Sequence, residues 1–364
     1  MRILHVVGAR PNFMKAAPVL RALAGRGVEQ FLVHTGQHYD AAMSAVFFDE
    51  LDLPRPDVDL EVGSGSHAWQ TAEVMKRIEP VILERRADAL LVYGDVNSTV
   101  AAAMVACKLG VPVAHVEAGL RSFDRTMPEE INRAITDQIS DLLLTHSPEA
   151  ADNLAREGVD ASRVHLVGNV MIDTLVRLLP RARAGHVLET RGLRTDGAVS
   201  PFVLATIHRP SNVDEPDRLT RVMRALAEVG KACEVVFPLH PRTRSRLADF
   251  DVDVEEGRVH LVDPLGYLDF LCLEDAAAAV ITDSGGIQEE TTYLGVPCFT
   301  VRPNTERPIT ISQGTNRLVG DNLEQLAALV RECLTPTRAA VHPPPLWDGR
   351  AAERIAEVAI VRYG

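Results

Sequence analysis

Acidic side chains follow strand-like apolar segments at three places in the first half of the sequence. Asp95 comes directly after "ALLVYG", Glu117 lies in the "HVEAG" that closes the next apolar segment, and Glu129 lies in "TMPEEINR". A carboxylate at the end of a buried strand loses solvation, so its charge has to be compensated or used there. Several carboxylates that converge on one site can take a proton from a substrate and return one. We therefore predict that Asp95, Glu117 and Glu129 carry acid–base chemistry.

Helix capping offers a structural alternative for two of these three residues. Asp95 precedes a predicted helix and suits a loop or cap position, while Glu129 suits the dipole of a helix that begins at Pro128. Glu117 is harder to explain in this way, because helix caps are normally Asp, Asn, Ser or Thr. Its neighbour Gly119 indicates a backbone that passes close to another group.

Two cations occupy the loop and helix start that follow the first strand-like segment. Arg10 and Lys15 lie in "GARPNFMK", which has neither the GxGxxG nor the GxxxxGK[ST] spacing of dinucleotide and Walker sites. An Arg and a Lys near a helix N-terminus suit an anionic group. The alternative is that both are solvated surface cations.

The second half of the sequence contains a pattern typical of a phosphate site. The segment "VITDSGGIQEE" places Ser284, Gly285 and Gly286 between a strand and a helix, where the backbone can approach a phosphate. Glu290, one turn into that helix, could accept hydrogen bonds from a ribose. His208 also follows a strand, although a lone strand-end histidine is more often structural. Together these residues predict a nucleotide-linked substrate.

The elements that must position these residues follow an α/β pattern. Apolar segments such as "RILHVV" and "ALLVYG" alternate with longer helix-like segments, which predicts parallel sheets covered on both faces. A second series of strands begins near residue 200. We predict two Rossmann-like, doubly wound domains, residues 1–169 and 170–349, with the ligand in the cleft between them and helix 350–364 packed back onto the first domain.

Composition narrows the class of protein further. The formal net charge of -12 argues against a nucleic-acid or anionic-membrane partner, since both need clustered Lys and Arg. No segment approaches the roughly 20 apolar residues of a membrane span. The spacing of the five cysteines is not that of metal ligands, so we predict no bound metal. We also predict that the cysteines are reduced and that the protein is cytoplasmic.

The combined motifs resemble one enzyme family over essentially the whole chain. The segments "GARPNFMK", "YGDVNST", "HVEAGLRS", "MPEEINR", "IHRPSNVD", "TDSGGIQEE" and "NTERPITISQGTNRLVG" occur in the order found in the non-hydrolysing UDP-N-acetylglucosamine 2-epimerases. The resemblance implies the B-type glycosyltransferase fold, a homodimer, and interconversion of UDP-N-acetylglucosamine and UDP-N-acetylmannosamine without a cofactor.

The resemblance also implies a mechanism and a role for each candidate residue. UDP would be eliminated to give 2-acetamidoglucal and would then return after C2 is reprotonated on its other face. Asp95, Glu117 and Glu129 would perform the acid–base steps. Arg10 and His208 would contact the diphosphate, and His208 would also belong to the catalytic set, while Lys15 would have an auxiliary role. Ser284, Gly285 and Gly286 would form the phosphate cradle, and Glu290 would bind the ribose.

The sequence departs from the best-known family pattern in three places. Pro210 and Ser211 follow His208 and Arg209 where many members have Arg-Glu, Tyr39-Asp40 replaces a second Gln, and Ile309 replaces a Glu. The first two regions resemble those that bind an allosteric activator in some members, so we predict that activation is weak or absent. The departures also leave two alternatives open: the substrate could be a UDP-2,3-diacetamido uronate, or the protein could belong to the hydrolysing epimerases.

Two other function classes compete with this interpretation. A B-type glycosyltransferase would share the fold and the nucleotide cradle but needs an acceptor site and only one base, and the three acidic loops argue against it. A catalytically silent nucleotide-sugar binding protein would not need Asp95, Glu117 and Glu129.

Overall fold

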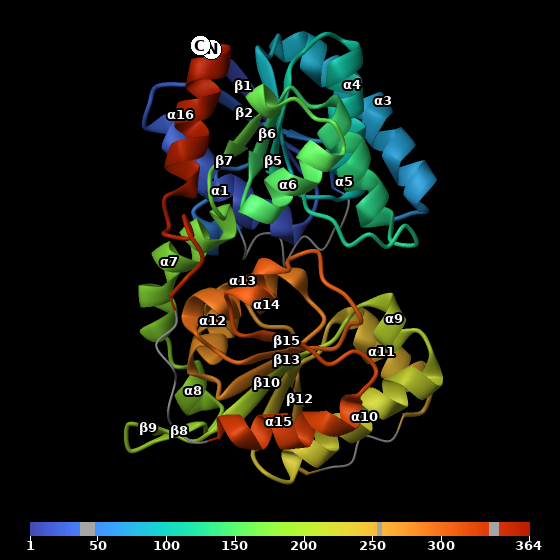
Figure 1. The fold of residues 1–364 in the computed structure, drawn as a ribbon, viewed down its shortest axis with the longest axis vertical. Helices are drawn as coiled ribbons and strands as arrows, with labels where there is room; N and C mark the ends of the chain where they lie inside the picture. The colour runs from blue at the N-terminus through green and yellow to red at the C-terminus, as the bar shows by residue number, and fades with distance from the viewer. Residues whose placement is uncertain (37–47, 253–256, 335–341) are drawn as a thin grey trace. The chain divides into compact units, whose positions relative to one another are not determined.

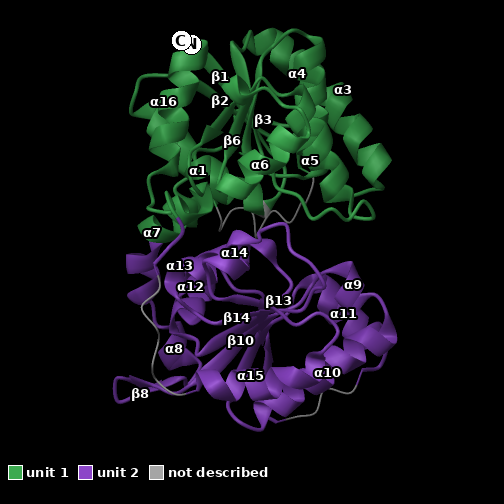
Figure 2. Ribbon diagram, in the orientation of Figure 1, with its two compact units in different colours: residues 1–177, 345–364 green, residues 178–344 purple. Residues whose placement is uncertain are grey.

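The chain folds into two compact units, each built around a parallel sheet. A computed structural model describes residues 1–36, 48–252, 257–334 and 342–364 (Figure 1). One unit comprises residues 1–177 and 345–364, and the other comprises residues 178–344 (Figure 2). We call them unit 1 and unit 2. Each is an α/β sandwich, which confirms the fold class predicted from the alternation of apolar and helical segments.

Unit 1 contains a seven-stranded parallel sheet with the strand order β3-β2-β1-β4-β5-β6-β7. Its strands are β1 (Arg2–Val7), β2 (Glu29–His34), β3 (Val58–Asp59), β4 (Ala89–Tyr93), β5 (Val113–Ala118), β6 (Leu142–Thr145) and β7 (Val164–Leu166). Its helices are α1 (Arg10–Ala24), α3 (His67–Arg85), α4 (Asn97–Lys108), α5 (Pro128–Ile139), α6 (Pro148–Arg156), the 3-10 turn η1 (Ala161–Arg163) and α16 (Ala351–Tyr363). Helix α7 (Val170–Arg183) runs across the boundary between the units.

Unit 2 contains a six-stranded parallel sheet with the order β12-β11-β10-β13-β14-β15, beside a small antiparallel pair. Its strands are β8 (Arg194–Thr195), β9 (Ala198–Val199), β10 (Phe202–Thr206), β11 (Glu234–Pro238), β12 (Val259–Val262), β13 (Ala279–Thr282), β14 (Cys298–Thr300) and β15 (Asn316–Leu318). Its helices are α8 (Val187–Thr190), α9 (Pro210–Val213), α10 (Pro216–Gly230), α11 (Pro241–Asp249), α12 (Tyr267–Ala276), α13 (Gly285–Leu294), α14 (Ile309–Ser312), η2 (Leu323–Gln325) and α15 (Leu326–Cys333).

The strand order brings the candidate loops together within each unit. In unit 1, β1 pairs with β2 on one side and with β4 on the other, so the chain reverses its direction of winding between β1 and β4. Unit 2 repeats this arrangement between β10 and β13. Ligands of doubly wound sheets bind beyond the carboxyl ends of the strands at such a point. The loops after β1 and β4, and those after β10 and β13, carry most of the predicted site residues.

Apolar side chains pack each sheet against neighbouring helices. In unit 1, side chains of β1 and β4 pack against α3 and α4, which lie on one face of the sheet (Figure 1). In unit 2, β10, β11 and β13 pack against α10 and α15. Continuous apolar strands of this kind are expected where helices cover both faces. None of the helices in the described ranges is long and apolar enough to span a membrane.

Helix ends are encoded locally. The Ser66 side chain accepts a hydrogen bond from the Trp69 backbone N–H at 3.3 Å and so caps α3. Pro128 occupies the first turn of α5, where a missing N–H costs nothing. Gly295, with φ 72°, ends α13 in the left-handed conformation that glycine adopts readily.

Helix α16 returns to unit 1 and packs against α1. Its first turn is capped by Asp173 of α7, whose carboxylate accepts hydrogen bonds from the backbone N–H groups of Ala351 at 3.0 Å and Ala352 at 2.6 Å. Arg26, just after α1, reaches Glu357 of α16 at 3.3 Å. The last residues of the chain therefore form part of the first unit.

Candidate active site

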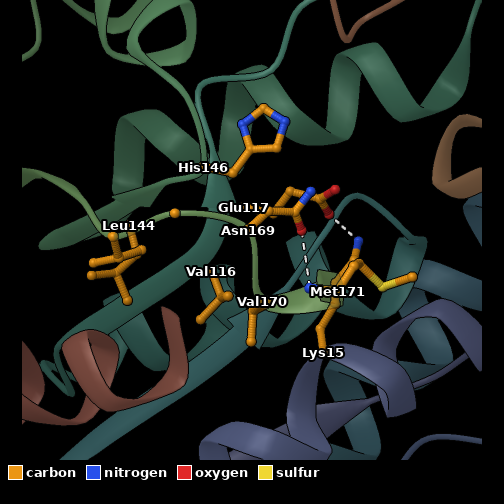
Figure 3. Close-up of a pocket in the computed structure, with 10 residues that line it drawn as sticks. Lys15, Val116, Glu117, Leu144, His146, Asn169, Val170 and Met171 are labelled. Atoms are coloured by element: carbon orange, nitrogen blue, oxygen red, sulfur yellow. Dashed lines mark hydrogen bonds and ion pairs between the residues drawn. The ribbon is translucent and has the colours of Figure 1, made fainter. Parts of the chain in front are cut away.

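Glu117 and Lys15 form a buried ion pair in unit 1. Lys15 projects from the first turns of α1 and donates a hydrogen bond to the Glu117 carboxylate, as Figure 3 shows. Lys15 is 5% exposed and Glu117 is 7% exposed. A buried carboxylate is tolerated when an opposite charge and hydrogen bonds compensate its lost solvation. Lys15 thus compensates the buried negative charge of Glu117, as we expected for a carboxylate at the end of a buried strand.

The backbone at Glu117 is strained. Its φ of 73° places a non-glycine residue in the left-handed region, and the pairing of β5 with β6 shifts register between Val116 and Ala118. Such a conformation costs about 1–3 kcal/mol and persists only where the surroundings impose it. The distortion turns the Glu117 side chain out of the alternation of the strand, toward Lys15 (Figure 3).

A small cavity lies beneath this ion pair. Its volume is about 10 Å³, which is room for about one water molecule. Lys15, Glu117, His146 and Asn169 are among the residues that line it (Figure 3). A nucleotide sugar is far too large for this cavity, so the cavity is part of the surroundings of the Glu117 carboxylate and not the substrate site.

Gly94 makes room for the Glu117–Lys15 pair. It follows β4 with a φ of 62°, and a Cβ built on it would lie 2.8 Å from Lys15 Nζ and 3.2 Å from Glu117 Oε2. Only glycine combines this backbone conformation with this close approach. The absence of a side chain at Gly94 therefore lets the loop after β4 pass directly against the ion pair.

A buried histidine connects the loops of Asp95 and Glu117. His115 Nε2 lies 2.7 Å from the Gly94 carbonyl oxygen, and His115 Nδ1 lies 2.7 Å from Asp137 Oδ1. Each ring nitrogen of His115 therefore lies within hydrogen-bonding distance of an acceptor oxygen. The other oxygen of Asp137 accepts a hydrogen bond from the Gly119 backbone N–H at 3.1 Å. His115 and Asp137 thus hold both sides of the strained turn.

Asp137 remains ionised in this completely buried position. Burial alone would raise the pKa of its carboxyl group, but the charges and hydrogen bonds of His115 and Arg121 outweigh burial and lower that pKa below its usual value. Arg121 NH1 lies 2.7 Å from Asp137 Oδ2. His115 and Arg121 therefore both contact one buried anion.

Asp95 belongs to a second ionic network at the same edge of the sheet. Its carboxylate pairs with Arg133 of α5, which also pairs with Glu130 at 2.7 Å. The Asn132 side chain donates a hydrogen bond to the Asp95 carbonyl oxygen at 2.9 Å. Helix α5 thereby fixes the loop after β4.

The two neighbouring acids at the start of α5 have different environments. Glu130 is buried and accepts hydrogen bonds from the backbone N–H groups of Ser122 at 2.9 Å and Phe123 at 2.8 Å. Burial alone would raise its pKa, but these bonds and Arg133 lower it overall. Glu129 lies in the same helical turn and is partly exposed. Glu130 is therefore a structural acid, and sequence spacing did not separate it from Glu129.

Two predictions for unit 1 fall on parts that the structure does not describe. The backbone of Arg10 begins α1, but its side chain lies outside the described part. The departure at Tyr39-Asp40 also lies outside the described residues.

In unit 2, Asp283 organises the loop that carries His208. The buried Asp283 carboxylate accepts hydrogen bonds from the backbone N–H groups of His208 and Arg209, and His208 Nδ1 lies 3.1 Å from it. Burial would raise the Asp283 pKa, but the charge of His208 and these hydrogen bonds lower it. With Nδ1 held by Asp283, the partly exposed His208 ring has Nε2 to offer a ligand. The sequence placed Asp283 at a strand end without revealing this role.

Ser284, Gly285 and Gly286 form the start of α13, next to a buried arginine. The first turn of α13 contains no acidic residue and Ser284 makes no side-chain cap, so its backbone N–H groups suit an anion. A Cβ on Gly285 would lie 2.4 Å from Arg307 NH1. Arg307 thus adds a positive charge directly beside the predicted phosphate cradle, which the sequence motif "TERP" alone did not reveal.

Buried acids hold Arg307 in place. Its Nε lies 2.8 Å from Glu289 Oε1, and its NH1 lies 2.5 Å from Glu306 Oε1. Glu306 also pairs with Arg302 at 2.7 Å. Burial would raise the Glu306 pKa, but the three cations around it, Arg307, Arg302 and Arg209, lower it well below its usual value. Ile309, which departs from the family pattern, is completely buried at the start of α14 and acts as a core residue.

Glu290 lies one turn into α13, as the sequence spacing predicted. It is 4% exposed, and its Oε1 accepts a hydrogen bond from the Tyr267 hydroxyl at 2.7 Å. Among the described residues, no group of three or more His, Cys, Asp and Glu side chains is arranged to hold a metal ion. The described site thus consists of carboxylates, cations and helix amides.

Comparisons with known proteins match this chain over its whole length. It is 41% identical over 370 residues to the UDP-N-acetylglucosamine 2-epimerase of Methanocaldococcus jannaschii, covering 100% of both chains. It is 42% identical over 362 residues to the UDP-2,3-diacetamido-2,3-dideoxy-D-glucuronate 2-epimerase of Pseudomonas aeruginosa, covering 98% of this chain and 99% of the relative.

A solved structure extends the similarity to the fold. The crystal structure of the Methanocaldococcus jannaschii enzyme in complex with UDP-GlcNAc and UDP superposes with a TM-score of 0.91 at 40% identity, and each chain is covered completely. Residues 21–359 also match the sequence signature described as UDP-N-acetylglucosamine 2-epimerase. By the extent of this match and by its whole-length identity to curated members, the chain belongs to the UDP-N-acetylglucosamine 2-epimerase family.

Proposed function

We propose that this protein interconverts UDP-N-acetylglucosamine and UDP-N-acetylmannosamine by inversion at C2. The observation that carries the proposal is the Glu117 carboxylate, which is buried, paired with Lys15 and held in a strained backbone conformation. Strain and buried charge of this kind gather at functional sites. Membership of the family supplies the reaction class.

The first half of the reaction eliminates UDP. The C2 hydrogen is not next to a carbonyl group, so it becomes acidic only as the bond from C1 to the phosphate oxygen breaks. A carboxylate takes the C2 proton, the C–H electrons form the C1=C2 double bond, and the C1–O electrons leave with UDP. The products of this step are UDP and 2-acetamidoglucal.

The second half reverses these steps on the other face of the sugar. An acid delivers a proton to the opposite face of C2, and the phosphate oxygen of UDP adds back to C1. This sequence needs one carboxylate to accept a proton, another group to donate one, and cations that retain UDP. We propose Asp95, Glu117 and Glu129 for the proton transfers.

The remaining residues would hold UDP between the two steps. We propose that Arg10, Lys15 and His208 contact the diphosphate and that Glu290 binds the ribose. Ser284, Gly285 and Gly286 would form the phosphate cradle, and the position of Arg307 beside Gly285 supports this assignment.

A related substrate is the second candidate. The chain is as similar to the diacetamido-glucuronate epimerase of Pseudomonas aeruginosa as to the UDP-N-acetylglucosamine 2-epimerase of Methanocaldococcus jannaschii. Both reactions would invert C2 in the same way. They differ in the substituents at C3 and C6 of the sugar.

Proton NMR in deuterated water tests the reaction. We expect purified protein, without added cofactor, to convert UDP-N-acetylglucosamine and, in a separate tube, UDP-N-acetylmannosamine into the same mixture with deuterium at C2. Conversion of the mannosamine substrate alone would support the predicted lack of allosteric dependence. Release of free N-acetylmannosamine would assign the protein to the hydrolysing class, and turnover of only a diacetamido uronate would establish the second candidate.

Glu117→Gln separates catalysis from binding. We expect turnover to fall at least about 100-fold, because general acid–base groups contribute about 10²–10⁴-fold. UDP affinity, measured by calorimetry, should stay within about threefold, since the amide keeps the shape of the side chain. Glu79→Gln, on the exposed face of α3, is the matched control. Full turnover by Glu117→Gln would contradict the assigned role.

We also propose that the protein acts in the cytoplasm as a homodimer. Family resemblance supports both statements, and unit 1 carries a surface suited to a second copy. A groove of about 390 Å³ is lined by residues of α3 and α5 that include Met75 and Ile131, and the exposed Trp69 and Ile135 lie on the same two helices. Light scattering of the purified protein should give twice the monomer mass of 39.7 kDa.

A further inference from the structure

Two buried carboxyl groups of unit 2 lie close enough to share a hydrogen bond when one of them is protonated. Glu274 lies on α12 and Glu290 on the adjoining α13. Glu274 is 0% exposed and faces Glu290, and no N–H or hydroxyl donor of the described residues reaches either Glu274 oxygen. Two carboxyl groups can form such a bond only when a proton lies between them.

The surroundings decide which of the two carries the proton. The Tyr267 hydroxyl donates to Glu290 Oε1 at 2.7 Å and so favours the ionised form of Glu290. Glu274 has no comparable donor. The proton therefore belongs to Glu274, which donates it to the Glu290 carboxylate.

The pKa values agree with this assignment. Burial, together with the charge of Glu290, raises the pKa of Glu274 well above its usual value. Burial also raises the pKa of Glu290 to about 7, although the hydrogen bonds from Tyr267 and Glu274 work against that rise. The other groups that face the pair are Glu289 of α13, which raises the Glu290 pKa, Asp275 of α12, which raises the Glu274 pKa, and Cys298 of β14.

A protonated carboxyl group at this position is useful only if the hydrogen bond that its proton forms has a function. An apolar side chain would fill the same space without the desolvation that a buried carboxyl group suffers. We propose that Glu274 is a positioning residue, whose carboxyl hydrogen bond keeps the Glu290 carboxylate charged and oriented to receive the ribose hydroxyls of UDP. This inference rests on the proposed function, in which Glu290 binds the ribose.

One consequence is that UDP binding depends on pH near neutrality. Protonation of Glu290 removes an acceptor from the ribose hydroxyls, so UDP affinity should fall below about pH 7. Removal of the Glu274 donor should raise the pH at which this fall begins. A hydrogen bond to a charged group corresponds to about one pH unit or more.

The test is calorimetric titration of UDP into the full-length protein from pH 5.5 to pH 8.5. Glu274→Leu should raise the midpoint of the affinity profile by about one pH unit and weaken binding about fivefold at pH 7. Glu274→Gln should keep the wild-type midpoint, because its amide still donates to Glu290. Asp269→Asn is the matched control, since it removes an exposed carboxylate from the first turn of the same helix and should leave the midpoint unchanged.

The outcomes distinguish this proposal from the proposed function. An unchanged midpoint in Glu274→Leu, or an equal shift in Glu274→Gln and Glu274→Leu, would overturn the role of Glu274 while UDP binding persists. Absence of UDP binding by the wild-type protein at every pH would overturn the proposed function instead, and with it the proposal that rests on it.

A second measurement needs neither UDP nor a folded leucine variant. Infrared spectra of the wild-type protein at pH 8 should contain the carbonyl band of a buried, protonated carboxylic acid, and Glu274→Gln should lack that band. Its absence from the wild-type spectrum would overturn the assignment of the proton to Glu274.

Discussion

Gly94→Ala tests whether the Glu117–Lys15 pair needs the space that glycine leaves. The new methyl group would lie 2.8 Å from Lys15 Nζ and 3.2 Å from Glu117 Oε2, both closer than ordinary van der Waals contact. The residue would also keep a φ of 62°. Gly110→Ala is the matched control, because Gly110 has a φ of 73° and no atom within 4 Å of a built Cβ.

The two substitutions share one energy term and differ in another. Left-handed backbone costs an L-residue about 1–2 kcal/mol, and both variants should lose that much stability. Gly94→Ala should lose a further 1–3 kcal/mol or so through overpacking against the ion pair. Displacement of a catalytic group by about 1 Å lowers the rate about 100-fold, which corresponds to about 2.7 kcal/mol in the activation free energy.

Urea denaturation and the epimerisation assay measure the two effects separately. We expect Gly110→Ala to retain wild-type kcat/KM with reduced stability, and Gly94→Ala to lose about 100-fold in kcat/KM as well. If Gly94→Ala turned over as fast as Gly110→Ala, the placement of Glu117 and Lys15 would not depend on this contact, and the reasoning would be refuted.

Two further predictions concern buried acids of unit 1. Asp137→Asn leaves His115 and Arg121 without their shared anion, so the free energy of unfolding in urea should fall by about 3–5 kcal/mol; a loss under about 1 kcal/mol would contradict the network. Burial raises the pKa of Asp173 from 3.8 to about 6. As pH rises through this interval the unfolded chain loses the proton first, so stability should fall by up to about 3 kcal/mol and then level off. Denaturation of Asp173→Asn at pH 4 and pH 7 should lack this contribution, and an identical pH dependence in both proteins would show that Asp173 does not cause it.

Much of the fold could be predicted because buried parallel strands are continuous apolar runs. "RILHVV" coincides with β1, and "DLLLTH" contains β6. Shorter edge elements were missed: β15 has only three residues, two of them exposed, and β3 has two. The domain boundary predicted at residue 169 lies directly before α7, in which Ile172, Leu175 and Leu178 are buried at helical spacing.

The candidate site was predictable to the level of the loops but not to the level of contacts. Strand ends located Asp95, Glu117 and Ser284, because the carboxyl ends of parallel strands meet at one edge. Sequence spacing could not show that Lys15 would pair with Glu117, since 102 positions separate them. The roles of Arg307 and Glu274 depend likewise on which distant loop or helix they meet.

The return of α16 to unit 1 has a consequence for the order in which the chain folds during synthesis. Residues 178–344 are contiguous, so unit 2 has all of its sequence once they leave the ribosome, whereas unit 1 also needs residues 345–364, which are made after unit 2. Until then Asp173 has no helix to cap, and the face of α1 that contacts α16 is uncovered. Unit 1 is thus completed after unit 2, although its synthesis starts first, and a premature stop codon between residues 345 and 364 would damage unit 1 rather than unit 2.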